Sequence, residues 1–543
     1  MRRAAYSLSI VLLGVLTFLA WMHPAVLSPT NVGWLLEGDD RGQSAIGLLA
    51  YLRAGNGWLH EPLLSAPQGL PLLFTDSIPL LGLLLTPVAG QLPPVQFIGL
   101  WYLACCLLQA LFASLLVRRY VTEPIALFAG AALLTVFPLL LNRYGHASLC
   151  AQWLLLWAIW IFVEPRRAHR PWWWAAVMAT AALIHSYLLL MVAAFWASAV
   201  LAQLWRGERL RVLVGAALAI APAVLLMIGH GALAGPYAST TTYGQFPAAL
   251  DAWWNPANAD FTALPISSPA MPEGRGFEGF SYLGAGLLLL GVLAIARTAT
   301  GRVQPSERGL LRRLAWLAPA FCVLALLAVG PAPVWRGQPL FALALPTALV
   351  NALDPVRASG RLLWPATYTL AFAAVAMAGK MSRATLFLGG ALALQLLDLT
   401  PMLTAVRATS ARANDPRIFT RTPNAHWTAL IAQAGAVQFE PTKPFRNLQL
   451  MEEIGWRAVV ACRPIRAVYA SREAVATRAR IDADAQAFRA GRLDKARLYV
   501  LLDNTPVSPL VVARVRVLDG IRIIPPSRPG PPVSCGTGSP SAS

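Results

Sequence analysis

Charged residues are scarce in this chain of 543 residues. They make up 13% of it, whereas a soluble domain carries about 25%. Hydrophobic residues make up 57%, which is more apolar surface than a soluble fold of this length can bury. The apolar residues gather in blocks of about twenty, the length that a helix needs to cross roughly 30 Å of hydrocarbon. The sequence therefore predicts an integral membrane protein surrounded by a lipid bilayer.

Cysteine is also scarce, with six residues in the chain. They form no CxxC pair and no Cys/His cluster, so the pattern argues against a structural zinc site. Four of them lie in apolar blocks and are expected to pack inside the protein. Cys462 and Cys535 fall in the polar C-terminal region, where an oxidising compartment would permit a disulfide between them.

Acidic residues are few beside basic ones, 25 against 44, which gives a formal net charge of +19. Such an excess is the usual electrostatic signature of a nucleic-acid-binding protein. Here, however, the basic residues cluster between alternate apolar blocks, as at Arg118-Arg119, Arg166-Arg167 and Lys380. This is the pattern of cytoplasmic loops in membrane proteins, so we expect no nucleic-acid partner.

The apolar blocks predict about eleven transmembrane helices. The first covers residues 5–22, and no small-residue cleavage site follows it, so we expect an uncleaved helix with a cytoplasmic N-terminus. The run Ser77–Val88 is too short to span and is expected at the membrane interface. The other spans are expected at about residues 95–117, 124–141, 148–163, 172–186, 187–204, 211–229, 281–296, 313–330, 361–379 and 384–400.

This topology divides the chain into a multi-span α-helical membrane domain over residues 1–400 and a small soluble α/β domain over residues 401–524. An odd number of spans places the second domain on the extracytoplasmic side. Residues 525–543 are rich in Pro, Gly and Ser and are expected to be a disordered tail. The substantial outer loops of the first domain are residues 23–94, 230–280 and 331–360.

The C-terminal domain carries the periodicities of both strands and helices. Strands are expected at Ile465–Tyr469, Arg497–Leu502 and Leu510–Ile524, and a helix at Val475–Ala490.

An acidic group, Glu37, Asp39 and Asp40, follows the first predicted span. Carboxylates beside a membrane are costly to bury and need a reason to persist. Asp39 or Asp40 could take a proton from an acceptor hydroxyl, or the two could hold Mg²⁺ or Mn²⁺ against a phosphate. Equally, they could lie in a solvated loop or cap the helix that starts near Gln43. The residue types alone leave both interpretations open.

Two further outer positions carry titratable side chains. Asp76 precedes the interfacial run, where its simplest role is to cap a helix. His146 lies in a tight turn between two spans, where a histidine is more often a structural hydrogen bonder than a catalyst. It becomes a general acid or base only if a carboxylate approaches it in the fold.

Arg357 and Arg361 are four residues apart at the outer end of a predicted span. If the intervening turn is helical, they share a face and suit bidentate binding of a phosphate or pyrophosphate. The alternative is anchoring to lipid headgroups, because Trp364 and Tyr368 nearby belong to the same interfacial chemistry.

Four motifs in order resemble a bacterial multi-pass family catalogued as domain of unknown function 6311. They are Thr75-Asp76-Ser77-Ile78-Pro79-Leu80, Gly145-His146-Ala147-Ser148-Leu149-Cys150, Glu278-Gly279-Phe280-Ser281-Tyr282-Leu283-Gly284, and Arg357-Ala358-Ser359-Gly360-Arg361 through Trp364-Pro365. The resemblance covers roughly residues 5–400. That family is in turn similar to polyprenol-dependent glycosyltransferases of the GT-C type, which carry an acidic motif in the first outer loop.

The resemblance implies a GT-C-like fold in the inner membrane of a bacterium, with an active site on the periplasmic side. Asp39 and Asp40 would be the acidic motif, Asp76 and His146 would line the same cavity, and Arg357 and Arg361 would bind the donor phosphate. One position departs from the expected pattern, since Gln152 stands where a histidine is expected.

Three hypotheses about function follow. The first is a glycosyltransferase that moves a sugar from a polyprenyl-phosphate donor to a glycan or lipid acceptor of the cell envelope. The second is a lipid or glycan transporter or flippase, although the large outer loops suggest one-sided chemistry and no duplicated half is visible. The third is a non-catalytic scaffold for envelope assembly with the same fold.

Overall fold

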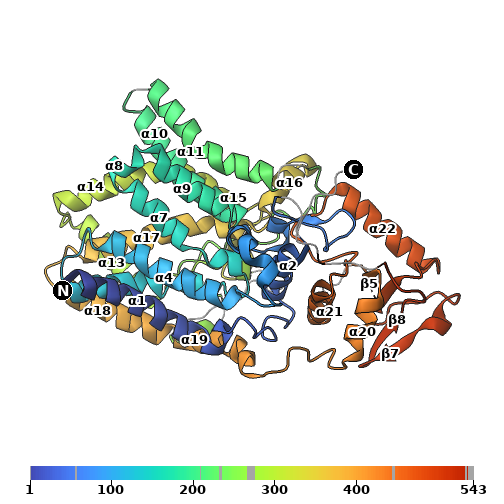
Figure 1. Ribbon diagram of the computed structural model, residues 1–543. Coiled ribbons are helices and arrows are strands. Elements are labelled where there is room, and N and C mark those ends of the chain that lie inside the picture. Colours follow the sequence, from blue (N-terminus) through green and yellow to red (C-terminus); the bar gives the residue numbers. More distant parts are fainter. Residues whose placement is uncertain are drawn as a thin grey trace.

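The computed structural model describes residues 2–54, 58–207, 209–231, 235–257, 259–265, 276–442, 447–531 and 535. A bundle of helices forms the larger part, and a smaller domain with a sheet lies beyond one end of the bundle (Figure 1). The N-terminal end of α1 (Arg2–Trp21) lies at the opposite end of the bundle from that sheet.

The bundle is built mostly from apolar helices, together with two basic ones, α8 (Pro165–Ala168) and α14 (Pro305–Leu314). Many of these helices begin with proline at their first turn, where its missing N–H costs nothing. Besides α1, the apolar helices are α4 (Ile98–Val117), α5 (Pro124–Thr135), α6 (Pro138–Leu141), α7 (Trp153–Phe162), α9 (Pro171–Ala182), α10 (Ser186–Leu204), α11 (Arg209–Gly229), α13 (Ala285–Ala299), α15 (Ala318–Val329), α17 (Trp364–Ala378) and α18 (Ala384–Asp398).

A helix lies in each segment predicted to span. Within the described residues, five helices, or six if the bent pair α18 and α19 (Thr400–Thr409) is one span, are long and apolar enough to cross a membrane. The figure of about eleven spans therefore stays a prediction. Large apolar side chains on the outside of the bundle, such as Leu213 and Leu225 on α11, are exposed, as expected of a surface that meets lipid.

Short elements gather at the end of the bundle that faces the sheet. α2 (Asp40–Ala54) begins within the acidic group and packs against η2 (Leu72–Thr75) and α3 (Pro79–Leu85). The interfacial run is thus a short helix, continued by η3 (Thr86–Gln91). The other short elements include η4 (Ala147–Cys150), α12 (Gly276–Gly279), α16 (Thr347–Leu353), η8 (Asp354–Val356) and η9 (Ser359–Leu363).

The C-terminal domain contains a four-stranded sheet in the order β5-β6-β8-β7. β5 and β6 are parallel, and the remaining pairs are antiparallel. The strands are β5 (Ala436–Glu440), β6 (Arg497–Leu501), β7 (Arg516–Leu518) and β8 (Ile521–Ile524), and the helices are α20 (His426–Gln433), α21 (Leu448–Val460) and α22 (Val475–Arg489).

Most of the expected elements of this domain are present. The predicted helix is α22, the middle predicted strand is β6, and the last predicted run contains the β7–β8 hairpin. The strand predicted at Ile465–Tyr469 is wrong, because Ile465 forms only isolated bridges with Leu64 and Val437. The alternating side chains of this stretch belong to an extended segment between the two domains, which forms isolated bridges instead of a continuous strand ladder.

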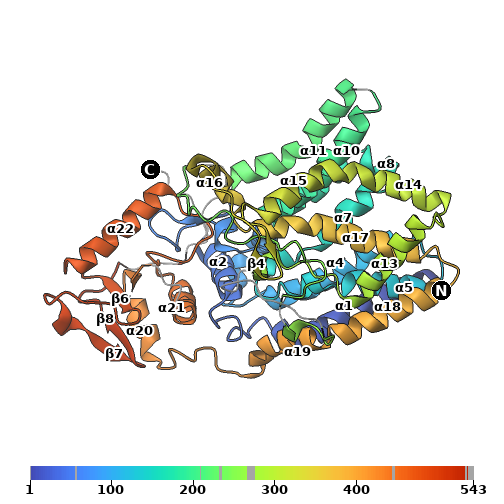
Figure 2. The same ribbon diagram turned by 180° about the vertical axis from the view of Figure 1, so that it is seen from behind.

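The two domains are in direct contact. α19 follows α18 with a bend of 51° and packs against α1. α21 packs against α2, and the two lie side by side in both views (Figures 1 and 2).

Cys462 and Cys535 form a disulfide with their Cα atoms 5.6 Å apart. Most of the tail predicted to be disordered, residues 532–534 and 536–543, lies outside the described residues.

Candidate active site

The turn that carries Asp76 is fixed against α2. The Ser44 hydroxyl donates to the backbone oxygen of Asp76 (3.0 Å), and the Ser77 hydroxyl donates to the backbone oxygen of Ser44 (2.7 Å). Gly47 makes this contact possible, because a Cβ at that position would lie 2.3 Å from the Thr75 hydroxyl oxygen. The sequence thus holds Asp76 beside the first turn of α2, where Asp40 lies.

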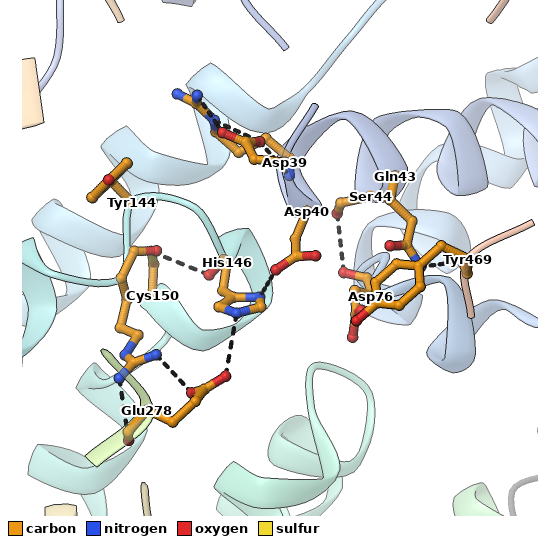
Figure 3. Close-up of polar contacts among 12 residues, drawn as sticks. Asp39, Asp40, Gln43, Ser44, Asp76, Tyr144, His146, Cys150, Glu278 and Tyr469 are labelled. Atoms are coloured by element: carbon orange, nitrogen blue, oxygen red, sulfur yellow. Dashed lines mark hydrogen bonds and ion pairs between the residues drawn. The ribbon is translucent and has the colours of Figure 1, made fainter. Parts of the chain in front are cut away.

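His146 lies between two carboxylates that come from distant parts of the chain (Figure 3). Its Nδ1 is 2.8 Å from Oδ2 of Asp40, and its Nε2 is 3.8 Å from Oε1 of Glu278. The condition set by the sequence, a carboxylate within reach of His146, is therefore met by Asp40. Burial alone would lower the pKa of His146, but the charge and hydrogen bond of Asp40 outweigh it and raise the pKa to about 9. At neutral pH the imidazole is held as a cation.

Glu278 also anchors two arginines. Arg361 donates to it through Nε (2.6 Å) and Nη2 (2.5 Å), and Arg143 donates through Nη1 (2.9 Å). Burial would raise the pKa of Glu278, but these guanidinium groups hold it well below its ordinary range. Arg143, with 0% of its side chain exposed, has its charge compensated here.

Two glycines bring Glu278 and Arg361 together. A Cβ on Gly360 would lie 2.5 Å from the Cα of Gly279, and a Cβ on Gly279 would lie 2.2 Å from the backbone oxygen of Pro247. Only glycine allows this approach, so the residues that follow Glu278 and precede Arg361 set the geometry of their ion pair.

Asp76 differs from the other carboxylates of this cluster. Among the described residues, none forms a hydrogen bond or ion pair with its carboxylate. Burial, followed by the charge of Asp40, raises the pKa of Asp76 to about 6. Opposing effects come from His146, Arg361 and Arg357, whose positive charges favour the ionised form. Among the described residues, Asp76 is therefore an unpaired carboxylate, and its pKa lies near neutrality.

Asp39 turns away from the cluster. Both of its oxygens accept hydrogen bonds from the Arg41 guanidinium, at 3.0 and 2.8 Å, and Oδ1 also accepts from the backbone N–H of Arg41 (2.9 Å). The capping interpretation therefore describes Asp39, while Asp40 reaches the cluster.

These contacts do not fit a divalent cation held by Asp39 and Asp40 together, because Arg41 occupies one carboxylate and His146 contacts the other. No group of three or more His, Cys, Asp or Glu side chains suited to a metal occurs among the described residues. The Mg²⁺ or Mn²⁺ site stays a prediction, and no step is derived from it.

Arg357 and Arg361 have different surroundings. Arg361 is committed to Glu278, and its guanidinium carbon also lies 5.1 Å from the ring centre of Tyr187. Arg357 is half-buried and donates through Nη1 to the Thr240 hydroxyl (3.3 Å). The two arginines are close to the same cluster, but Arg357 has no carboxylate partner among the described residues.

The C-terminal domain forms one wall of this cluster. Tyr469 lies beside Asp76, and its backbone oxygen accepts from Nε2 of Gln43 on α2 (2.6 Å; Figure 3). Burial, then Asp40 and Asp76, raises the pKa of Tyr469 to about 12. Glu452 on α21 accepts from the backbone N–H of Gly38 (2.7 Å). The second domain therefore contacts the segment that carries Asp39 and Asp40 and holds it in place.

The family comparison covers both parts of the chain. The family described as domain of unknown function DUF6311 matches residues 11–400, and its C-terminal domain matches residues 426–526. The chain belongs to the DUF6311 family. No curated protein matches it. The resemblance to DUF6311 is confirmed, and the likeness of this DUF6311 protein to GT-C glycosyltransferases stays a prediction.

The sequence alone missed three residues of the cluster in this DUF6311 protein. Glu278 opens one of the four motifs, and Arg143 lies in the same turn as His146, so each stood beside a recognised signal. Tyr469 had none, because only the docking of the second domain brings it to Asp76. Gln152, the departure from the expected pattern, is buried and accepts a hydrogen bond from the Tyr368 hydroxyl (2.6 Å).

A cavity of about 710 Å³ lies elsewhere in the DUF6311 protein, between α9, α10 and α11. Arg170, Trp172, Arg206 and Arg211 are among its lining residues, and none of the residues of the acidic cluster is. The candidate site is the cluster and not this cavity, because at the cluster a carboxylate with a raised pKa lies among ion-paired groups.

Proposed function

We propose that this protein is a membrane glycosyltransferase that moves a sugar from a polyprenyl-phosphate donor to a hydroxyl of an envelope acceptor, with Asp76 as the general base. The observation that carries the proposal is the carboxylate of Asp76 beside Asp40, which is unpaired within the described part of the chain and has a pKa of about 6. A base that works near neutral pH needs a pKa in this range and a free oxygen for the proton.

The proposed reaction is a single displacement at the anomeric carbon. Asp76 takes the proton of the acceptor hydroxyl while that oxygen forms a bond to the anomeric carbon. The bond from this carbon to the phosphate oxygen breaks, and its electron pair leaves with the polyprenyl phosphate. Because negative charge grows on the departing phosphate, positive charge close to it lowers the barrier.

The cluster supplies positive charge on the side where the phosphate would leave. His146 and Arg361 are cations fixed by Asp40 and Glu278, and the positive charge of Arg357 also acts on Asp76. Fixed cations need no reorganisation as charge develops. Arg361 acts in this proposal by holding Glu278 and the orientation of His146, while direct contact of Arg361 with the phosphate stays a prediction.

We propose that the cluster faces the periplasm of the bacterial inner membrane. Each of the three predicted outer loops supplies a residue to it, namely Asp40, Glu278 and Arg357, and the predicted outer turn supplies His146. The basic helices α8 and α14 lie toward the opposite end, near the N-terminus (Figure 2). A disulfide in the C-terminal domain also fits an oxidising compartment.

The test is turnover of a polyprenyl-phosphate hexose that carries a radiolabelled sugar, by the purified full-length protein in detergent. The assay measures loss of label from the lipid phase, so transfer of the sugar to an acceptor and its hydrolysis by water are both detected. We expect Asp76→Asn to reduce the rate about 100-fold or more, because the amide cannot take the proton. Asp415→Asn, at an acidic residue of the junction outside the cluster, is the matched control. An Asp76→Asn rate equal to the wild-type rate would remove Asp76 as the base.

A further inference from the structure

The second DUF6311 domain brings an arginine to the same turn that carries Arg357. Nη2 of Arg472 donates to the backbone oxygen of Asp354 (2.7 Å), and the backbone N–H of Arg357 donates to that same oxygen (3.1 Å). Nη1 of Arg472 lies 3.7 Å from Oδ2 of Asp354. The Arg472 guanidinium therefore lies on the turn η8 that directly precedes Arg357, although 115 positions separate the two arginines in the sequence.

The segment around Arg472 is fixed by backbone hydrogen bonds to the membrane domain. The N–H of Ser471 donates to the oxygen of Phe74 (2.9 Å), two residues before Asp76. The N–H of Ala238 donates to the oxygen of Glu473 (2.9 Å), and the N–H of Val475 donates to the oxygen of Pro236 (3.1 Å). Arg472 is thus held in place from both sides, as binding groups need to be.

The charges of this region do not balance locally. Asp354 lies beside the Arg472 guanidinium (3.7 Å), and its oxygens already accept from Thr240 through the backbone N–H (3.1 Å) and the hydroxyl (2.7 Å). Arg357 and Arg472 are close enough for their charges to repel, since burial and then the charge of Arg357 lower the pKa of Arg472. Arg472 has one already hydrogen-bonded carboxylate beside it, and Arg357 has no carboxylate partner among the described residues. Two partly exposed guanidinium groups in this situation favour an anion with two or more oxygens.

We propose that Arg357 and Arg472 together form a phosphate-binding site that spans the two domains and receives the lipid phosphate of the substrate. The sequence had paired Arg357 with Arg361, whereas the structure commits Arg361 to Glu278 and places Arg472 beside Arg357. The identity of the anion as a donor phosphate rests on the proposed function. The site itself does not, because binding is measured without turnover.

The experiment measures binding of undecaprenyl phosphate in detergent micelles to the full-length protein by microscale thermophoresis, with phosphatidylglycerol and inorganic phosphate measured in parallel. We expect Arg357→Gln and Arg472→Gln each to weaken undecaprenyl-phosphate binding about 10-fold or more, the usual effect of losing a charge-assisted hydrogen bond. Arg516→Gln, at an exposed arginine of β7, is the control and is expected to bind as the wild type does.

Thermal unfolding of each variant separates binding from docking. The Arg357 guanidinium donates to Thr240 of the first domain, and among the described residues it forms no hydrogen bond or ion pair with the second domain. Arg357→Gln is therefore expected to weaken binding at an unchanged melting temperature. If only Arg472→Gln weakens binding, and its melting temperature also falls, Arg472 is a docking contact and the proposal is overturned. Wild-type affinity in both variants overturns it as well.

The parallel lipids identify the source of the phosphate. Phosphatidylglycerol that binds as tightly, with the same dependence on both arginines, would assign the site to bilayer headgroups and contradict the donor assignment. Weakened undecaprenyl-phosphate binding in both variants, in a protein that shows no sugar transfer, would uphold the site and reject the glycosyltransferase proposal.

Discussion

At the scale of residues, one carboxylate of the cluster has no hydrogen-bond or ion-pair partner in the part of the chain that the structure describes, while its neighbours are paired. Asp39 is bonded to Arg41, Asp40 to His146, and Glu278 to Arg143 and Arg361. Pairing fixes the charge of those groups, whereas Asp76 can gain or lose a proton near neutral pH. Neighbouring carboxylates in different environments have different pKa values, so one can act as a base while the others stay ionised.

This arrangement predicts a bell-shaped dependence of the transfer rate on pH. The rate is expected to rise as pH passes about 6, where Asp76 loses its proton and becomes a base. It is expected to fall as pH passes about 9, where His146 loses its proton and the site loses a cation. Label release measured from pH 5 to pH 10 checks both limbs, which belong to the coupled cluster as a whole.

The variant Asp40→Asn tests the cause of the upper limb. Without the charge of Asp40, the pKa of His146 falls, so the alkaline limb is expected to move to lower pH. The pKa of Asp76 is also expected to fall, because the nearby negative charge that raises it is gone. An unchanged profile in Asp40→Asn would contradict the contact between Asp40 and His146 as its source.

At the scale of elements, close approaches through glycine position the charged groups. Gly47 allows α2 to lie close to the turn that carries Asp76, and Gly360 allows η9 to lie close to α12. Such contacts tolerate no added methyl group unless the backbone shifts, and overpacking of this kind costs about 1–3 kcal/mol.

Gly360→Ala is therefore expected to lower the melting temperature and to slow transfer, because its Cβ would push Arg361 away from Glu278. Gly389→Ala on α18 is the matched control, since no atom lies within 4 Å of the added Cβ there. Unfolding followed by intrinsic fluorescence, together with label release, measures both effects. Equal stability and rate in the two variants would show that the approach of Gly360 to Gly279 is not tight.

The elements also show what the sequence could predict. Apolar length located a helix in each predicted span, and alternation located β6 and the β7–β8 hairpin. The same alternation failed at Ile465–Tyr469, because isolated bridges to Leu64 and Val437 replace a ladder there. In the candidate site, Asp40, Asp76 and His146 were predicted from the positions of outer turns and from the resemblance. Tyr469 and Arg472 were not, because their places depend on how the second domain docks, which no local pattern encodes.

At the scale of the whole molecule, the basic helices α8 and α14 and the cluster lie toward opposite ends of the bundle. We expect a membrane-impermeant maleimide to label Val517→Cys on β7 in intact spheroplasts, and to label Thr298→Cys on α13 only after permeabilisation. Both variants carry Cys322→Ala, which removes the exposed native thiol. Labelling of Thr298→Cys in intact spheroplasts, with Val517→Cys protected, would invert the topology.

The two domains form one site in this account, so the most direct measurement is a structure of the full-length protein with a non-hydrolysable polyprenyl-phosphate sugar. The account predicts density for the phosphate within hydrogen-bond reach of Arg357 and Arg472, with the anomeric carbon facing Asp76. Phosphate density in the cavity between α9, α10 and α11, with the cluster around Asp76 unchanged, would contradict it.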